Sequence, residues 1–279
     1  MGRYELEYPK DANNTVKRHN ERGWSIKPAQ SLYHHHLTDS PAAAIYALKT
    51  IHSLVNASPL LHISFTPPDS AFPTILPMIG QMGSFDRPSA SISDPLDLYI
   101  HGYVSSRVMK VARSGKGLPV CVAVSFVDGY VLALSAFNHS YNYRSAVLFG
   151  HATIVEDQDE KLYALELITD GFLPGRWNNT RLPPLGAEMQ STSVLKVKIE
   201  SGSAKFRDGQ ASDDKHDLEN ETALNSTWTG VIPIHQTYGD PIASSYNRVE
   251  FPGYATEFIE ESNKENKEHC VKAAENKGN

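Results

Sequence analysis

"VCVAVSFVDGYVLALSAFNHSYNYRSAVLFGHATI", residues 120–154, contains the pattern that decides the fold. Two apolar, β-branched stretches flank Asp128–Gly129, a dipeptide typical of a two-residue type I′ hairpin. A polar cluster follows, and a further strand is predicted over 144–155. The stretch therefore predicts antiparallel strands joined by short turns.

The polar cluster at the start of this last strand has more hydrogen-bonding side chains than a turn needs. It runs from His139 to Ser145. Arg144 can donate two parallel hydrogen bonds to a phosphate or carboxylate, and Tyr141 or Tyr143 can lie against a flat ring. The alternative is a structural polar network that ties a strand end to a loop.

Other strands are predicted on both sides of this stretch, over 60–65, 72–80, 96–103 and 192–201. Helices are predicted from about Pro41 to Val55, from Ser105 or Ser106 to near Gly115, and over 157–171, where Gly171 is the expected stop. Because the helices are few and do not alternate regularly with strands, we expect a mainly β, antiparallel barrel with peripheral helices.

The chain is divided by composition into three parts. Residues 1–38 are a polar, irregular extension, and 39–258 form one domain with an acidic surface insert at 208–226. Residues 259–279 are highly charged, so we expect a disordered tail.

Charge and composition exclude several classes of partner. The net charge of −6 provides no positive field for nucleic acid, and no apolar stretch approaches the ~20 residues that would span a bilayer. The N-terminus lacks a secretory signal, so a cytoplasmic protein is expected. No metal site is expected at His34–His36, because consecutive side chains point in different directions.

Common catalytic signatures (GxSxG, HExxH, GxGxxG, the Walker loop) are absent from the sequence. "HGYVSSRVMK", residues 101–110, instead suggests an anion site. Ser105 and Ser106 stand where a helix begins, and Arg107 and Lys110 neighbour each other on it, which suits a phosphate monoester. The alternative is a capped surface helix with solvated cations.

"GRWNNTRLPP", residues 175–184, is a third candidate, with Trp177 and Arg181 on a loop after a helix. Its alternative is a packed loop without a binding role.

Together these segments resemble the flavin-nucleotide-binding branch of the pyridoxamine 5′-phosphate oxidase-like superfamily, which includes 5-nitroimidazole-resistance proteins. The matching segments cover most of 60–235, and "HSxNYRSxxxFGxA", residues 139–152, is the most specific block. Asn138, where histidine is frequent in the family, and the His-rich N-terminal stretch depart from the pattern.

The resemblance implies a single-domain split β-barrel that forms a homodimer with FMN at the subunit interface. The 72–80 strand would lie beside the flavin ring, 101–110 would take the phosphate, and the partner would contribute Trp177 and Arg181. The implied flavin contacts are Thr74, Ile75, Pro77, Met78, His101, Gly102, Ser105, Ser106, Arg107, Lys110, Asn142, Tyr143, Arg144, Ser145, Trp177 and Arg181.

The function expected from this resemblance is an FMN-dependent oxidoreductase acting on a small planar molecule, with the flavin supplying the redox chemistry. His101 and His139 are the candidates for proton handling, and a structural role is the alternative for each. Two other functions stay open. One is a non-catalytic flavin carrier or sensor, and the other is a haem-binding or haem-degrading protein with a histidine as axial ligand.

Overall fold

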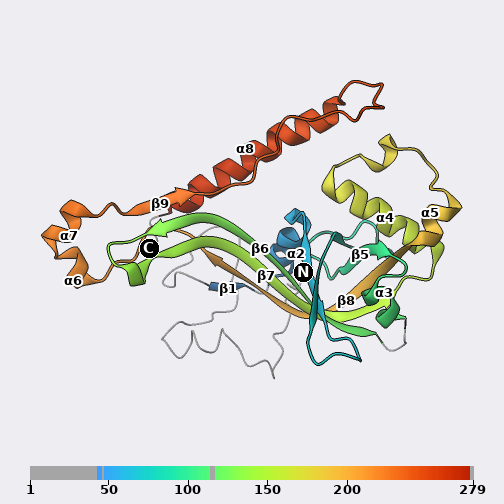
Figure 1. The fold of residues 1–279 in the computed structure, drawn as a ribbon, viewed down its shortest axis with the longest axis horizontal. Coiled ribbons are helices and arrows are strands. Elements are labelled where there is room, and N and C mark those ends of the chain that lie inside the picture. The colour runs from blue at the N-terminus through green and yellow to red at the C-terminus, as the bar shows by residue number, and fades with distance from the viewer. Residues whose placement is uncertain (1–42, 46, 114–116, 277–279) are drawn as a thin grey trace. The chain divides into compact units, whose positions relative to one another are not determined.

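The computed structural model describes residues 43–45, 47–113 and 117–276 (Figure 1). The 1–38 extension, with His34–His36, lies outside the described residues. The strands are β1 (Ala43–Ile45), β2 (Leu61–Phe65), β3 (Thr74–Met78), β4 (Gly80–Gly83), β5 (Asp97–Tyr103), β6 (Leu118–Leu132), β7 (Ser140–Ile154), β8 (Thr192–Arg207) and β9 (Gly230–Pro233). The helices are α2 (Leu48–Ala57), α3 (Arg107–Ala112), α4 (Gln158–Phe172), α5 (Gly186–Ser191), α6 (Lys215–Leu218), α7 (Glu221–Ser226) and α8 (Gly253–Glu275), with 3₁₀ turns at Ala136–Asn138 and Trp177–Asn179.

The described strands form one nine-stranded sheet in the order β3-β2-β6-β7-β8-β5-β4, with β1 paired to β8 and β9 to β6. The pairs β2–β3, β2–β6, β4–β5, β5–β8 and β6–β9 are antiparallel. This confirms the mainly β, antiparallel fold with peripheral helices. The order ends at β3 and β4, so the sheet is not closed.

Two compact units can be described separately. Among the described residues, the first unit contains residue 45, residues 47–113 and 117–125, and Ser145–Ala204, and the second contains 43–44, Phe126–Arg144 and 205–276. Strands β6, β7 and β8 each run from one unit into the other.

Helix α4 covers one face of the sheet in the first unit. Asp157 caps its start by accepting a hydrogen bond from the Glu160 backbone N–H at 2.8 Å. Ala164 and Ile168 of α4 pack against Tyr99 of β5 and Val194 of β8. The helix continues through Gly171, the expected stop, where a Cβ would lie 2.4 Å from the Gln81 side chain.

The predicted turn at Asp128–Gly129 is wrong, because β6 continues to Leu132 and the chain reverses at residues 133–139. The Asp128 side chain is buried and forms an ion pair with Arg144, so it does not serve as a turn residue. Gly129 pairs with β9 instead, and a Cβ there would lie 2.9 Å from Val231 Cγ1. The glycine is required for close strand approach.

The predicted disordered tail is also wrong over residues 259–275, which belong to helix α8. Ala255, Cys270, Ala273 and Ala274 are buried, so the helix has an apolar stripe despite its charge. The Gly209 backbone N–H donates to the Ala273 carbonyl at 2.7 Å, so one of the carbonyl groups at the C-terminal end of α8 has a hydrogen-bond partner outside the helix. Packing within the second unit therefore stabilises a segment whose composition alone indicates disorder.

The remaining elements differ less from prediction. The first predicted helix begins later, as α2 at Leu48, and is preceded by strand β1. The 208–226 insert contains α6 and α7, and most of its residues are exposed. Among the helices of the described residues, none combines the length and hydropathy needed to cross a bilayer.

Candidate functional site

The side chains of strand β5 alternate between two faces of the sheet. Tyr99 packs against α4, and His101, two residues further, faces the same way. Gly102 faces the other way, since a Cβ there would lie 3.2 Å from both Met78 Cε and Met109 Cε. We call the face that His101 points to the α4 side, and the face of Gly102 the α3 side.

The α3 side brings together two of the sequence-predicted segments. Strand β3 contacts β5, and its Met78 lies beside Gly102. Among the described strands β3 pairs only with β2, so the N–H and C=O groups of its other edge are available to a ligand. Thr74 and Met78 are half-buried, whereas Ile75 and Pro77 are exposed.

The beginning of helix α3 supplies hydroxyl and basic groups to this side. The Ser106 Oγ is buried and has no hydrogen-bond partner in the described part of the chain. Arg107 donates to Asp69 at 2.5 Å in an ion pair whose two side chains are 50% and 77% exposed. Ser105 and Lys110 are also exposed.

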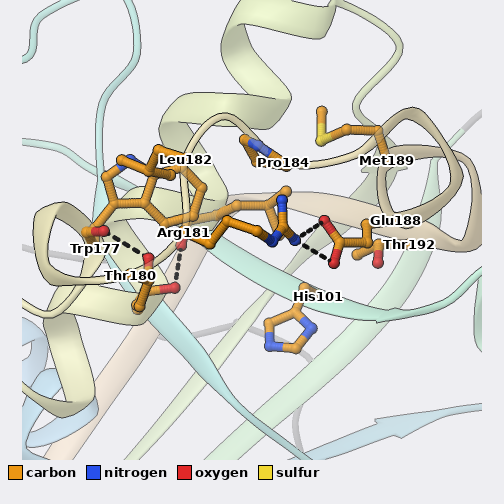
Figure 2. Close-up of a pocket in the computed structure, with 11 residues that line it drawn as sticks. His101, Trp177, Thr180, Arg181, Leu182, Pro184, Glu188, Met189 and Thr192 are labelled. Carbon is orange, nitrogen blue, oxygen red and sulfur yellow. Dashed lines mark hydrogen bonds and ion pairs between the residues drawn. The ribbon is translucent and has the colours of Figure 1, made fainter. Parts of the chain in front are cut away.

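The α4 side contains a pocket of about 440 Å³ (Figure 2). His101 lines it together with Trp177 and Arg181, so two segments predicted separately from sequence meet here within one chain. Apolar surface comes from Leu165, Leu182, Pro184 and Met189. Burial lowers the pKa of His101, which favours a neutral imidazole at pH 7.

The loop wall of this pocket is fixed by polar contacts. Trp177 N–H donates to Asp170 of α4 at 2.7 Å, and Arg181 Nη2 donates to both Glu188 carboxylate oxygens, at 2.6 and 2.7 Å. Glu188 also accepts from the Leu185 N–H, and these contacts lower its pKa, with the Arg181 hydrogen bond as the largest cause. Sequence reasoning did not identify Glu188, because its role depends on a fold of the loop that no local motif indicates.

Asn142 and Arg144 lie in the second unit and make internal contacts there. Buried Asn142 donates to the carbonyls of Gly209 and Ala273 at 3.1 and 3.3 Å and accepts from Arg207 at 2.5 Å. Arg144 donates to both carboxylate oxygens of Asp128, at 2.8 and 2.9 Å. These two residues form a structural polar network, the alternative that the sequence left open, and any flavin contact by them stays a prediction.

The other predicted residues of this cluster differ in environment. Tyr143 is half-buried, and burial raises its pKa. Ser145 is half-buried in the first unit. His139 is exposed in the β6–β7 turn, where its Nδ1 accepts from the Ala133 N–H at 3.3 Å. Of the two candidate histidines, His101 lines the α4-side pocket.

We expect His101 to make the stability of the fold depend on pH. Its folded-state pKa lies below the usual 6.5, so the unfolded chain binds more protons as the solution is acidified. The contribution of the neutral His101 imidazole to the free energy of unfolding is fully present above about pH 6.5 and is lost as the pH falls below that value. Urea denaturation between pH 5 and 8 should show a flatter pH dependence for His101→Gln, whereas the exposed-site control His62→Gln keeps the wild-type slope. Identical slopes for all three proteins would contradict this.

The open antiparallel sheet with peripheral helices defines the class of fold. The sequence profile of the family described as pyridoxamine 5′-phosphate oxidase matches residues 48–206, more than half of the chain, and the protein belongs to this family. Among curated proteins no match was found.

Two solved structures are similar over most of their length. One is the flavocytochrome Anf3 from Azotobacter vinelandii, with 28% identity and a TM-score of 0.63 over 77% of this chain and 91% of that chain. The other is the FAD and haem binding protein from Mycobacterium smegmatis, with 27% identity and a TM-score of 0.61 over 74% and 91%. The family resemblance predicted from the sequence is therefore confirmed.

Proposed function

We propose that the protein binds a flavin nucleotide, FMN, on the α3 side of β5. With this flavin the protein acts as an oxidoreductase on a small planar molecule. The observation that carries the proposal is that, among the described residues, the outer edge of β3 has no paired strand and the Ser106 hydroxyl has no hydrogen-bond partner, while Met78 of β3 packs against Gly102 of β5. Family membership and two relatives named for a flavocytochrome and for FAD and haem binding support it.

The residues on this side fit the group. The free edge of β3 can hydrogen-bond the polar rim of a flavin ring, and Ser106 can donate to a phosphate oxygen. The Arg107–Asp69 pair is exposed, and exposed ion pairs contribute little to stability, so a phosphate can take the place of Asp69 at little cost. When bound, the flavin supplies hydride-transfer chemistry, while the chain binds and orients it.

A homodimer with the flavin at the subunit interface is part of this proposal. Light scattering of the flavin-loaded protein measures its molecular mass. The mass of a single chain would contradict a flavin site at a subunit interface. Trp177 and Arg181, expected from the partner, line the α4-side pocket beside His101 of their own chain.

Spectroscopy tests the proposal directly. Apoprotein titrated with FMN should show the visible flavin bands of a bound, saturable complex, and a parallel titration with FAD decides between the two nucleotides. Anaerobic reduction by NADH or NADPH and reoxidation by an added planar acceptor then separate an enzyme from a carrier. A bound flavin that no pyridine nucleotide or amine donor reduces would contradict the enzymatic half and leave a carrier or sensor.

Arg107→Ala should weaken FMN binding by about 1.5–3 kcal/mol if the guanidinium makes a charge-assisted contact with the phosphate. Arg248→Ala, which removes an exposed arginine of the second unit, is the control and should leave the affinity unchanged. Calorimetric titration measures both. Equal FMN affinity in the two variants would move the phosphate site away from α3.

A haem in the α4-side pocket, with His101 as axial ligand, is a second candidate. A neutral imidazole among apolar side chains favours it, because a haem iron is ligated by the unprotonated ring nitrogen. Haemin titration should then give a shifted Soret band in the wild type and in His139→Ala, but not in His101→Ala. The same shift in His101→Ala would exclude this ligand.

A further inference from the structure

Arg181 in the α4-side pocket has unused hydrogen-bonding capacity. Of the five N–H bonds of its guanidinium, two point to Glu188 and one, on Nη1, points to the Pro183 carbonyl at 3.0 Å. Among the described residues, the Nε–H and the second Nη1–H have no partner. Arg181 therefore lines the pocket and keeps two N–H groups that have no partner among the described residues (Figure 2).

The Arg181–Glu188 pair can be exchanged for another anion at little cost. The two side chains are 55% and 50% exposed, and pairs of this kind contribute little to stability. Glu188 keeps its hydrogen bond from the Leu185 N–H at 2.7 Å if Arg181 turns away. Neither charge is left buried without a partner, so a ligand oxyanion can replace the Glu188 carboxylate.

The rest of the pocket selects the body of such a ligand. Trp177 offers a flat aromatic surface, and Leu182 and Met189 add apolar area. A planar, apolar ring system is favoured by these walls, because ring stacking and apolar burial both stabilise it.

We propose that Arg181 recognises an oxyanion, a carboxylate, sulfonate or phosphate, on a planar ligand that lies against Trp177, and that Glu188 occupies Arg181 until this ligand binds. The inference rests on the second candidate of the proposed function, a planar ligand in the α4-side pocket, and names the class of that ligand. It does not depend on flavin binding, which is assigned to the opposite side of β5.

Two dyes that differ mainly in one sulfonate test this. 8-Anilinonaphthalene-1-sulfonate carries the anion, and N-phenyl-1-naphthylamine does not. Fluorescence titration should show that Arg181→Gln weakens the sulfonated dye by about tenfold or more, the loss of a charge-assisted contact, while the neutral dye binds as before. Glu188→Gln should tighten the sulfonated dye alone, because it frees the guanidinium. Arg248→Gln, which makes the same charge change in the second unit, should alter neither affinity.

Several outcomes would overturn the proposal. Equal preference for the sulfonate in wild type and Arg181→Gln would exclude Arg181 as the anion receptor, and weaker sulfonate binding in Glu188→Gln would exclude displacement of Glu188. FMN titration of the same variants separates this inference from the flavin proposal. If Arg181→Gln lowers FMN affinity and leaves dye preference unchanged, Arg181 belongs to the flavin site and the inference fails. If FMN never binds but the dye preference follows Arg181, only the flavin proposal fails.

Discussion

Asp128→Ala is expected to lower the free energy of unfolding by about 3–5 kcal/mol, because it leaves the Arg144 guanidinium without the buried carboxylate it pairs with. The Asp128 side chain is 3% exposed and that of Arg144 is 21% exposed. Asp128 also lies 3.5 Å from His269 Nε2 and accepts from the Cys270 thiol at 3.6 Å, both on α8. One carboxylate therefore holds strands β6 and β7 and helix α8 together within the second unit.

Urea denaturation of the variant measures this loss, with Asp240→Ala, an exposed aspartate of the same unit, as control. Burial alone would raise the pKa of Asp128, but hydrogen bonds from His269 and Arg144 outweigh it and lower the pKa. The stabilisation is therefore present above about pH 4 and is lost as the pH falls, so wild type and variant should converge in acid. An Asp128→Ala variant as stable as Asp240→Ala would refute the role given to this pair.

Asn142→Ala is expected to cost about 2–4 kcal/mol, since the buried amide satisfies three groups at once. It accepts from Arg207, which is 9% exposed, and donates to the carbonyls of Gly209 and Ala273. Alanine leaves the Arg207 N–H without its acceptor in a buried position, and it removes a bond that holds the end of α8.

Thermal or urea unfolding of the flavin-free protein is the appropriate measurement, because it separates a structural role from a cofactor contact. Asn225→Ala, at an exposed position on α7, is the control and should stay near wild type. If the flavin-free Asn142→Ala protein keeps wild-type stability while FMN affinity falls, Asn142 contacts the flavin as the family resemblance implies.

The strands were predictable because their signal is local. Alternating apolar residues locate β2 and β5 close to their observed bounds, and they locate the start of β8, which runs on to Arg207 beyond the predicted 192–201. Scattered helices indicate an antiparallel sheet. The start of α3 follows Ser106, as expected from a helix-capping residue type, although Ser106 makes no side-chain cap.

The errors arose where a tertiary partner decides the structure. Asp128–Gly129 has the composition of a turn, but its carboxylate pairs with Arg144 and its glycine accommodates β9. The charged tail has the composition of a disordered segment, but α8 buries four residues against its own unit. Neither Arg144 nor Gly209 is adjacent in sequence to the segment it stabilises, so no local pattern indicates the contact.

The sequence named residues that line the two sides of β5 but did not indicate how they are arranged, and ligand contacts by them stay a prediction. His101 and Gly102 were grouped in one phosphate segment, yet alternation along β5 places them on opposite faces of the sheet. Trp177 and Arg181 were separate from His101 in sequence and meet it in one pocket. Because side chains of a strand alternate between its two faces, the sequence position of each β5 residue predicts whether it lies on the α3 side or the α4 side.

Calorimetric titration of apoprotein with FMN, repeated with FAD, tests the flavin assignment most directly. We expect saturable heat with an end point near one flavin per chain, a weaker isotherm in Arg107→Ala, and an unchanged one in Arg248→Ala. An absence of binding heat with both nucleotides, in protein whose fold is intact by circular dichroism, would contradict the assignment of a flavin site to this chain.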